Sequence, residues 1–197
     1  MVAAYALPGK GEPREQRMLL HGVSWKDYVI VRELLDGPGL RMTYIRGALE
    51  LMSPSPEHEL WKKNIARFVE HFAWVKDVPL HGYGSTTFKK EVEERGAEPD
   101  ECYLVGKKLG AYPEIVIEVI YSAPLLDKLE VYRPMGIPEV WVFEQGAFRI
   151  WVLDQGKYRQ QPRSALIPAL DFEMLARYAV REDTPQALRE FDAEIRR

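Results

Sequence analysis

Two apolar stretches that each carry an acid decide the fold: PDECYLV at residues 99–105 and PEIVIEVI at residues 113–120. Their β-branched and aromatic residues predict a strand in each. Asp100 and Glu118 stand in these runs where apolar residues would otherwise be expected, and burying an unpaired carboxylate is costly. Metal binding is the most economical explanation for both acids.

Outward from these two strands, hydrophobic periodicity and turn residues predict the other elements. We expect helices at residues 24–35, 56–75, 125–135, 172–178 and 185–195, and strands at 40–45, 48–52, 100–105, 115–120, 139–143, 148–153 and 157–160, with a further strand signal at 85–88. Residues 1–23 contain prolines and glycines among charges and predict an irregular arm. The rest, residues 24–197, predicts a single α/β domain with a mixed central β-sheet flanked by helices. The strands on either side of helix 125–135 should be parallel, joined by a right-handed crossover.

Composition limits the classes of function. The chain has 197 residues, and its 27 basic and 30 acidic residues give a net charge of −3, so contact with nucleic acid would need a local basic surface. Cys102 is the single cysteine, which excludes an intrachain disulfide and a cysteine-rich zinc site and suits a reducing compartment. No run approaches the roughly 18 apolar residues needed to span a bilayer. We therefore expect a cytoplasmic protein with no membrane partner.

The two acids can form one site. Strand alternation places Glu118 on one face of its strand, and Glu98 and Asp100 together on one face of the other. If the strands are neighbours, Asp100 and Glu118 converge. Two hard oxygen ligands with open positions suit Mg²⁺ or Mn²⁺ better than zinc, and the backbone carbonyl of Val119 can add a third oxygen. The plain alternatives are a turn residue after Pro99 and a structural ion pair for Glu118.

Three further residues are candidates for chemistry. Lys128, with Tyr132 one turn on, can reach back to the metal face to stabilise charge on a phosphoryl group or to orient an attacking water. The alternative is a surface lysine whose stem covers an aromatic ring. His58 lies on the inward stripe of helix 56–75, where a satisfied core histidine is more common than a base. Glu50 is most simply a solvent-facing strand residue.

Several segments together resemble one family. They are Gly84-Ser85-Thr86-Thr87, Glu98-Pro99-Asp100-Glu101-Cys102-Tyr103, Ile117-Glu118-Val119, Asp127-Lys128 with Tyr132, and Gly136-Ile137-Pro138-Glu139-Val140-Trp141. An acid after proline, followed by a hydrophobic strand with a second acid, resembles the PD-(D/E)XK nuclease superfamily. The surrounding residues are similar to the Uma-type restriction endonuclease family, which is large, bacterial and abundant in cyanobacteria. The resemblance runs from about Tyr44 to about Leu153.

The resemblance implies a restriction-endonuclease-like fold and a Mg²⁺-dependent endonuclease that hydrolyses phosphodiester bonds, with DNA as the expected nucleic acid. It implies that Asp100 and Glu118 bind the metal, with Mn²⁺ as the other suitable ion. It also implies that Lys128 replaces the lysine that the motif expects where this chain has Ile120.

The resemblance leaves the rest of the site and the partners open. Glu50 or His58 would complete the site from the N-terminal elements. Local basic charge is offered by Lys62-Lys63, Lys89-Lys90 and Lys107-Lys108, so a homodimer is a possible way to assemble a groove. The alternatives are an inactive module of the same fold that binds nucleic acid or a protein partner, and a metal-dependent hydrolase of a small phosphoester. We expect the amphipathic C-terminal helix to cap the sheet rather than to form a dimer surface.

Overall fold

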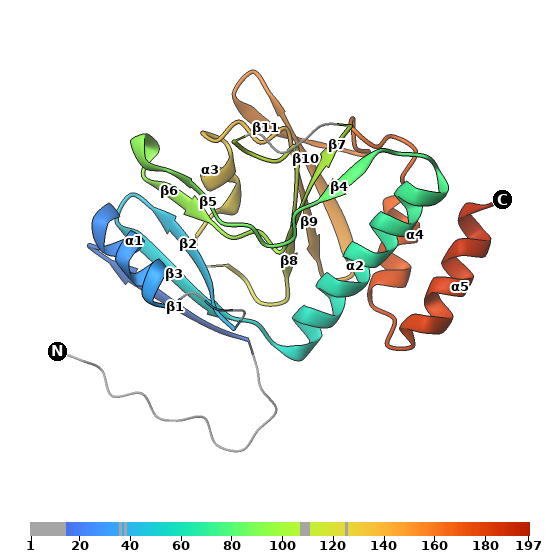
Figure 1. Ribbon diagram of the computed structural model, residues 1–197, viewed down its shortest axis with the longest axis horizontal. Helices are drawn as coiled ribbons and strands as arrows, with labels where there is room; N and C mark the ends of the chain where they lie inside the picture. The colour runs from blue at the N-terminus through green and yellow to red at the C-terminus, as the bar shows by residue number, and fades with distance from the viewer. Residues whose placement is uncertain (1–14, 36, 38, 107–110, 125) are drawn as a thin grey trace, which may run out of the picture.

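The computed structural model describes residues 15–35, 37, 39–106, 111–124 and 126–197. Two β-sheets face each other (Figure 1). The five-stranded sheet comprises, in spatial order, β1 (Gln16–His21), β3 (Ala48–Ser53), β2 (Arg41–Ile45), β6 (Arg95–Ala97) and β5 (Phe88–Lys90). The six-stranded sheet comprises β11 (Lys157–Gln161), β10 (Ala147–Asp154), β9 (Glu139–Glu144), β8 (Ile115–Ile120), β7 (Glu101–Val105) and β4 (Leu80–Gly82).

The helices are α1 (Trp25–Leu34), α2 (Pro56–Val75), α3 (Lys128–Tyr132), α4 (Phe172–Ala179) and α5 (Thr184–Ile195), with a short 3₁₀ turn η1 (Glu91–Glu93). Helix α1 covers the outer side of the five-stranded sheet, α2, α4 and α5 cover the outer side of the six-stranded sheet, and α3 lies between the two sheets (Figure 1). Within the described ranges, no helix is both long enough and apolar enough to cross a bilayer. The six-stranded sheet is mixed, because β8 and β9 are parallel while its other pairs are antiparallel. The expected α/β fold with a mixed sheet is therefore confirmed, and so is the parallel crossover around α3.

Local sequence signals explain the element boundaries near the site. Ser55 caps α2 by accepting a hydrogen bond from the His58 N–H (3.2 Å), and Pro56 occupies the first turn, where its missing N–H costs nothing. The β2–β3 hairpin turns at Arg46 and Gly47, whose φ angles are 39° and 89°. Positive φ at both central residues is typical of the tight turn that matches the twist of a hairpin.

The six-stranded sheet buries both faces, with a different partner on each. One face carries Ile117 and Val119 and packs against α2 and α4, on which α5 lies in turn. The opposite face carries Val116 and packs against α3 and the edge of the five-stranded sheet, where Phe88 and Ala97 lie. Because residues alternate along a strand, Glu118 belongs to this second face. Its carboxylate therefore lies between the two sheets.

The outer side of the five-stranded sheet is covered by α1. Tyr28 of α1 stacks on Tyr44 of β2, with ring centroids 4.7 Å apart and planes 11° from parallel. It also lies directly over Gly96 of β6, where an added Cβ would sit 2.2 Å from the Tyr28 hydroxyl. Only glycine allows this close approach.

The structure corrects the expectation of an irregular arm over residues 1–23. Residues 16–21 form the edge strand β1, paired antiparallel with β3 from Gln16↔Ser53 to His21↔Ala48. Residues 1–14 lie outside the described part of the chain. The local sequence does not predict β1, because this strand is stabilised by pairing with β3, whose edge in the β2–β3 hairpin would otherwise be unpaired.

Two other predicted elements differ in extent. The helix expected at residues 125–135 is only α3, because Asp127 caps its start and Pro134 cannot donate the bond that would continue it; residue 125 lies outside the described ranges. The strand signal near residues 85–88 corresponds only to β5, and β4 belongs to the other sheet.

The C-terminal helix packs on its own domain. Phe191 of α5 is fully buried, 4.9 Å from the ring of Phe68 in α2 and 5.3 Å from that of Tyr178 in α4. The apolar side of this helix is therefore buried on its own domain, as expected, but it packs on α2 and α4 rather than directly on the sheet.

Candidate active site

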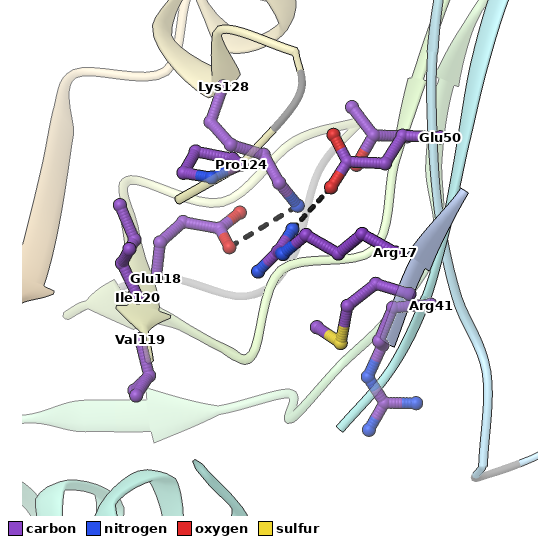
Figure 2. Close-up of a pocket in the computed structure, with 10 residues that line it drawn as sticks. Arg17, Arg41, Glu50, Glu118, Val119, Ile120, Pro124 and Lys128 are labelled. Atoms are coloured by element: carbon purple, nitrogen blue, oxygen red, sulfur yellow. Dashed lines mark hydrogen bonds and ion pairs between the residues drawn. The ribbon is translucent and has the colours of Figure 1, made fainter. Parts of the chain in front are cut away.

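A small pocket lies between the two sheets (Figure 2). The five-stranded sheet contributes Arg17 and Glu50, and the segment from β8 to α3 contributes Glu118, Pro124 and Lys128. Its volume is about 10 Å³, which is room for about one water molecule. The side chains of Lys128 and Arg17 both point into the space between Glu118 and Glu50.

Glu118 is held by two donors from α3. Its side chain is buried; one carboxylate oxygen accepts a hydrogen bond from the Tyr132 hydroxyl, and the other lies 3.3 Å from the Lys128 ammonium. Burial raises the pKa of Glu118, Lys128 opposes that rise, and the negative charge of Asp100 adds to it. The structure thus brings together Glu118, Lys128 and Asp100, three of the residues that the sequence predicted for the site.

Asp100 lies just before β7 and touches the neighbouring strand. The Val119 N–H donates to Asp100 Oδ2 (2.8 Å), and His58 Nε2 lies 3.0 Å from Asp100 Oδ1. Burial raises the pKa of Asp100, but the bond and charge of His58, the Val119 N–H and the charge of Lys128 outweigh it and lower the pKa. Asp100 is therefore ionised at neutral pH. The carbonyl of Val119 as a third metal ligand stays a prediction.

His58 joins two carboxylates. It is fully buried at the start of α2, with Nδ1 2.9 Å from Glu15 Oε2 and Nε2 3.0 Å from Asp100. Burial lowers the pKa of an imidazole, but the hydrogen bonds and charges of Asp100 and Glu15 outweigh it and raise the pKa of His58 to about 9. A charged imidazole has no lone pair to accept a proton, so in this arrangement His58 is a cation between two acids rather than a general base.

Glu50 is buried, which corrects the expectation of a solvent-facing residue. One of its carboxylate oxygens pairs with Arg17, and the other accepts a hydrogen bond from the Leu126 N–H (2.8 Å). Glu50 lies on β3, which is flanked by β1 and β2, and its side chain faces the segment between β8 and α3, where Leu126 lies. Glu50 therefore lies beside the site. This agrees with the prediction that either Glu50 or His58 would complete it.

Glu98 does not share the site. Its carboxylate pairs with Arg32 of α1 and accepts a hydrogen bond from Thr87 (3.2 Å). The expected alternation fails because β6 ends at Ala97 and β7 begins at Glu101, so no continuous strand connects Glu98 with Asp100.

Sequence reasoning missed two residues of the site, Glu15 and Arg17. Both fall in the segment that was expected to be irregular, and nothing in the local pattern marks them as functional. The signal that would have found them is the pairing of β1 with β3, which sets Arg17 opposite Met52, two residues along β3 from Glu50.

The carboxylate oxygens of Asp100 and Glu118 fit a hard divalent cation that keeps several water ligands. In the part of the chain that the structure describes, no group of three His, Cys, Asp or Glu side chains is arranged to bind a metal ion, which argues against a closed zinc-type site. Asp100 and Glu118 supply two carboxylates, and Mg²⁺ usually binds through one or two. The charge of Asp100 raises the pKa of Glu118, so a cation between them would relieve their repulsion.

In two of the predicted basic segments, one lysine of the pair makes an intramolecular contact, while Lys63 and Lys89 are exposed. Lys62 is buried, with Nζ 3.3 Å from Glu59, and Lys90 donates to the Pro134 carbonyl. Lys107-Lys108 lies outside the described residues. A basic face for a polyanion is therefore not assembled from these two pairs alone.

Comparisons with known proteins agree with this architecture. The sequence model of the family Uma2, described as "Putative restriction endonuclease", matches residues 25–178. Among solved structures, a protein described as "a putative nuclease belonging to DUF820" from Anabaena variabilis is similar, with 10% sequence identity and a TM-score of 0.50 over 78% of this chain and 99% of that chain. At this identity the likeness shows the fold alone. No curated protein matches this chain.

Proposed function

Because this chain belongs to the Uma2 family of restriction endonuclease-like proteins, we propose that it is a metal-dependent endonuclease that hydrolyses phosphodiester bonds of DNA. The family and the fold are those of nucleases. The metal, the DNA substrate and the roles of individual residues are what the proposal adds.

One observation carries the proposal. Asp100, Glu118 and Lys128 come from the start of β7, from β8 and from α3, yet the Lys128 ammonium is 3.3 Å from Glu118 and its charge lowers the pKa of Asp100. Two acids and a lysine in one buried cluster are the groups that phosphodiester hydrolysis with a hard cation requires.

Each residue has a separate task. Asp100 and Glu118 would hold Mg²⁺ or Mn²⁺, which when bound lowers the pKa of a water and neutralises charge on phosphoryl oxygens. Lys128 would place its ammonium against the non-bridging phosphoryl oxygens, where negative charge develops. Tyr132 would orient Glu118 through its hydroxyl, and Asp100 is oriented by His58 and the Val119 N–H. A homodimer would bring the basic residues of two chains together along the nucleic acid.

A specific observation favours a second candidate, an inactive module of the same fold that binds nucleic acid or a protein partner. The site carboxylates are already paired with Arg17, His58 and Lys128, and the pocket has room for about one water. A phosphodiester reaches Glu118 only if some of these pairs separate. Metal binding distinguishes the two candidates.

The test is calorimetric titration of Mn²⁺ into the protein at neutral pH, without nucleic acid. We expect the wild type to bind, and Glu118→Ala and Asp100→Ala to lose binding while their thermal unfolding remains cooperative. The matched control is Glu130→Ala, which removes an exposed acid of α3 that pairs with Arg133, and it should bind as the wild type does. Unchanged Mn²⁺ affinity in either site variant would place the metal elsewhere, and no binding by the wild type would favour the module.

A further inference from the structure

The pocket holds a second cation besides Lys128, and it comes from outside the residues that the family model matches. Arg17 lies on β1, before residue 25, where that match begins. Its guanidinium bonds Glu15 Oε1 through Nε (3.1 Å) and Nη2 (2.9 Å), and Glu50 through Nη1. Its side chain is only 9% exposed, yet it lines the same pocket as Glu118 and Lys128 (Figure 2).

Glu15 fixes the direction of this guanidinium. Its side chain is 1% exposed and accepts hydrogen bonds from the Ser122 N–H (3.1 Å) and the Ser122 hydroxyl, while its other oxygen meets His58. Ser122 follows β8, and His58 begins α2, so Glu15 is anchored on two elements besides its own. Arg17 is therefore held in one orientation before any ligand arrives, which reduces the ordering cost of binding.

The balance of charges in the site favours a second cation that can bind phosphate. Its carboxylates are those of Glu15, Glu50, Asp100 and Glu118, and the cations that pair with them are those of Arg17, His58 and Lys128. Arg41 also lines the pocket, but its guanidinium points away from Glu50 and Glu118 and lies 3.9 Å from Glu59 (Figure 2). His58 lies between two acids and Arg41 is directed towards Glu59, so among the described cations of the pocket only Lys128 would face an approaching phosphodiester if Arg17 merely held β1 in place. The planar guanidinium of arginine can bond a carboxylate through Nε and Nη2 and still present Nη1 to a phosphate oxygen, which a lysine ammonium cannot do in a fixed orientation.

We propose that Arg17 is a second phosphate-binding residue of this site, beside Lys128, and that Glu15 is the residue that positions it. The ligand is the phosphodiester backbone next to the bond that is cut, so the inference rests on the proposed function. The guanidinium keeps its Nε and Nη2 bonds to Glu15, and Nη1, which carries two N–H groups, donates one of them to a non-bridging phosphate oxygen. Glu50 keeps its bond from the Leu126 N–H.

The test measures the affinity of a short fluorescent DNA duplex with Ca²⁺ in place of Mg²⁺, over a series of salt concentrations. Loss of one phosphate contact should reduce the slope of log K against log salt by about 0.9. We expect Arg17→Met, which keeps the apolar stem, to show this change and to bind about 10-fold more weakly. Arg17→Lys should restore the slope but not the full affinity, because the charge returns without the two bonds to Glu15 that fix its position.

The matched control is Arg159→Met, which removes an exposed arginine of β11 that pairs with Asp154 and should leave slope and affinity unchanged. Thermal unfolding and Mn²⁺ titration of each variant show whether the fold and the metal ligands are intact. If folded Arg17→Met binds the duplex with the wild-type slope and affinity, Arg17 only fastens β1, and the inference is wrong while the proposed function stands. If the wild type itself binds no duplex, both fail.

Discussion

The charged side chains of this site are buried, and each is stabilised by a named partner. Glu15 shows the balance most clearly: burial raises the pKa of its carboxyl, but hydrogen bonds from His58 and Ser122 and the charge of Arg17 outweigh this and lower the pKa to about 2. His58 shows the same balance with the opposite sign of charge. Pairing of this kind offsets the free-energy cost of burying charged side chains in the protein interior.

The low pKa of Glu15 predicts a pH-dependent contribution to stability. Its pKa is about 2 when folded against 4.5 when unfolded, so the contribution is fully present above pH 4.5 and is lost as the pH falls towards 2. We expect Glu15→Gln to lower the free energy of unfolding at pH 7 by about 1 to 2 kcal/mol, a value reduced to allow for solvent screening. Urea unfolding at pH 7 and pH 3 measures it.

The control for this experiment is Glu33→Gln, which alters an exposed acid of α1. It should differ little from the wild type at both pH values. A Glu15→Gln deficit that is equally large at pH 3 and pH 7 would mean that shape, not charge, makes the contribution.

At the scale of elements, close packing between α1 and the five-stranded sheet depends on one glycine. The Cβ of an alanine at position 96 would lie 2.2 Å from the Tyr28 hydroxyl and 2.6 Å from its Cζ. Tyr28 cannot simply move aside, because it is fully buried and stacks on Tyr44. The glycine thus sets the distance between helix and sheet.

We expect Gly96→Ala to lower the free energy of unfolding by about 1 to 3 kcal/mol, the usual cost of overpacking a core. Thermal or urea unfolding measures the change. Gly37→Ala is the control, since no heavy atom lies within 4 Å of the Cβ it would add. The double variant with Tyr28→Phe, which removes the nearest atom, should recover part of the loss, and a fully stable Gly96→Ala would show that α1 can shift freely.

At the scale of the whole molecule, the site exists because two sheets meet at the start of α2. Glu118 and Lys128 come from the six-stranded sheet and its crossover, while Arg17 and Glu50 come from the five-stranded sheet (Figure 2). His58 and Asp100 close the same network from α2 and the start of β7. A change in how the sheets pack would therefore alter the metal ligands and the cations together.

Lys128→Met tests whether metal binding and phosphoryl transfer are separate tasks of this assembly. We expect Mn²⁺ affinity close to that of the wild type, because the two carboxylates remain. We expect DNA cleavage to slow by about 100-fold or more, the usual cost of removing one group that stabilises a transition-state charge. Calorimetry and cleavage of supercoiled plasmid measure the two effects, and normal turnover would move the catalytic cation elsewhere.

Much of the fold follows from the sequence because its signals are local. The bounds of α2 agree with prediction because Ser55, Pro56 and a regular apolar stripe all lie within the helix or next to it. The β2–β3 hairpin follows from Arg46-Gly47, and the parallel pairing of β8 with β9 follows from the helical connection between them. Asp100 and Glu118 could be singled out for the same reason, since an acid inside an apolar strand, or directly before one, is visible in the local sequence.

What the tertiary structure decided depends on contacts between distant parts of the chain. Arg17 reaches Glu50, and Glu15 reaches Ser122, only after β1 has paired with β3 and the two sheets have met. Glu50 is buried for the same reason. The sequence alone therefore determined which strands carry the acids, and the packing of the sheets determined which charges surround them, because burial and charge pairing are properties of the assembled core.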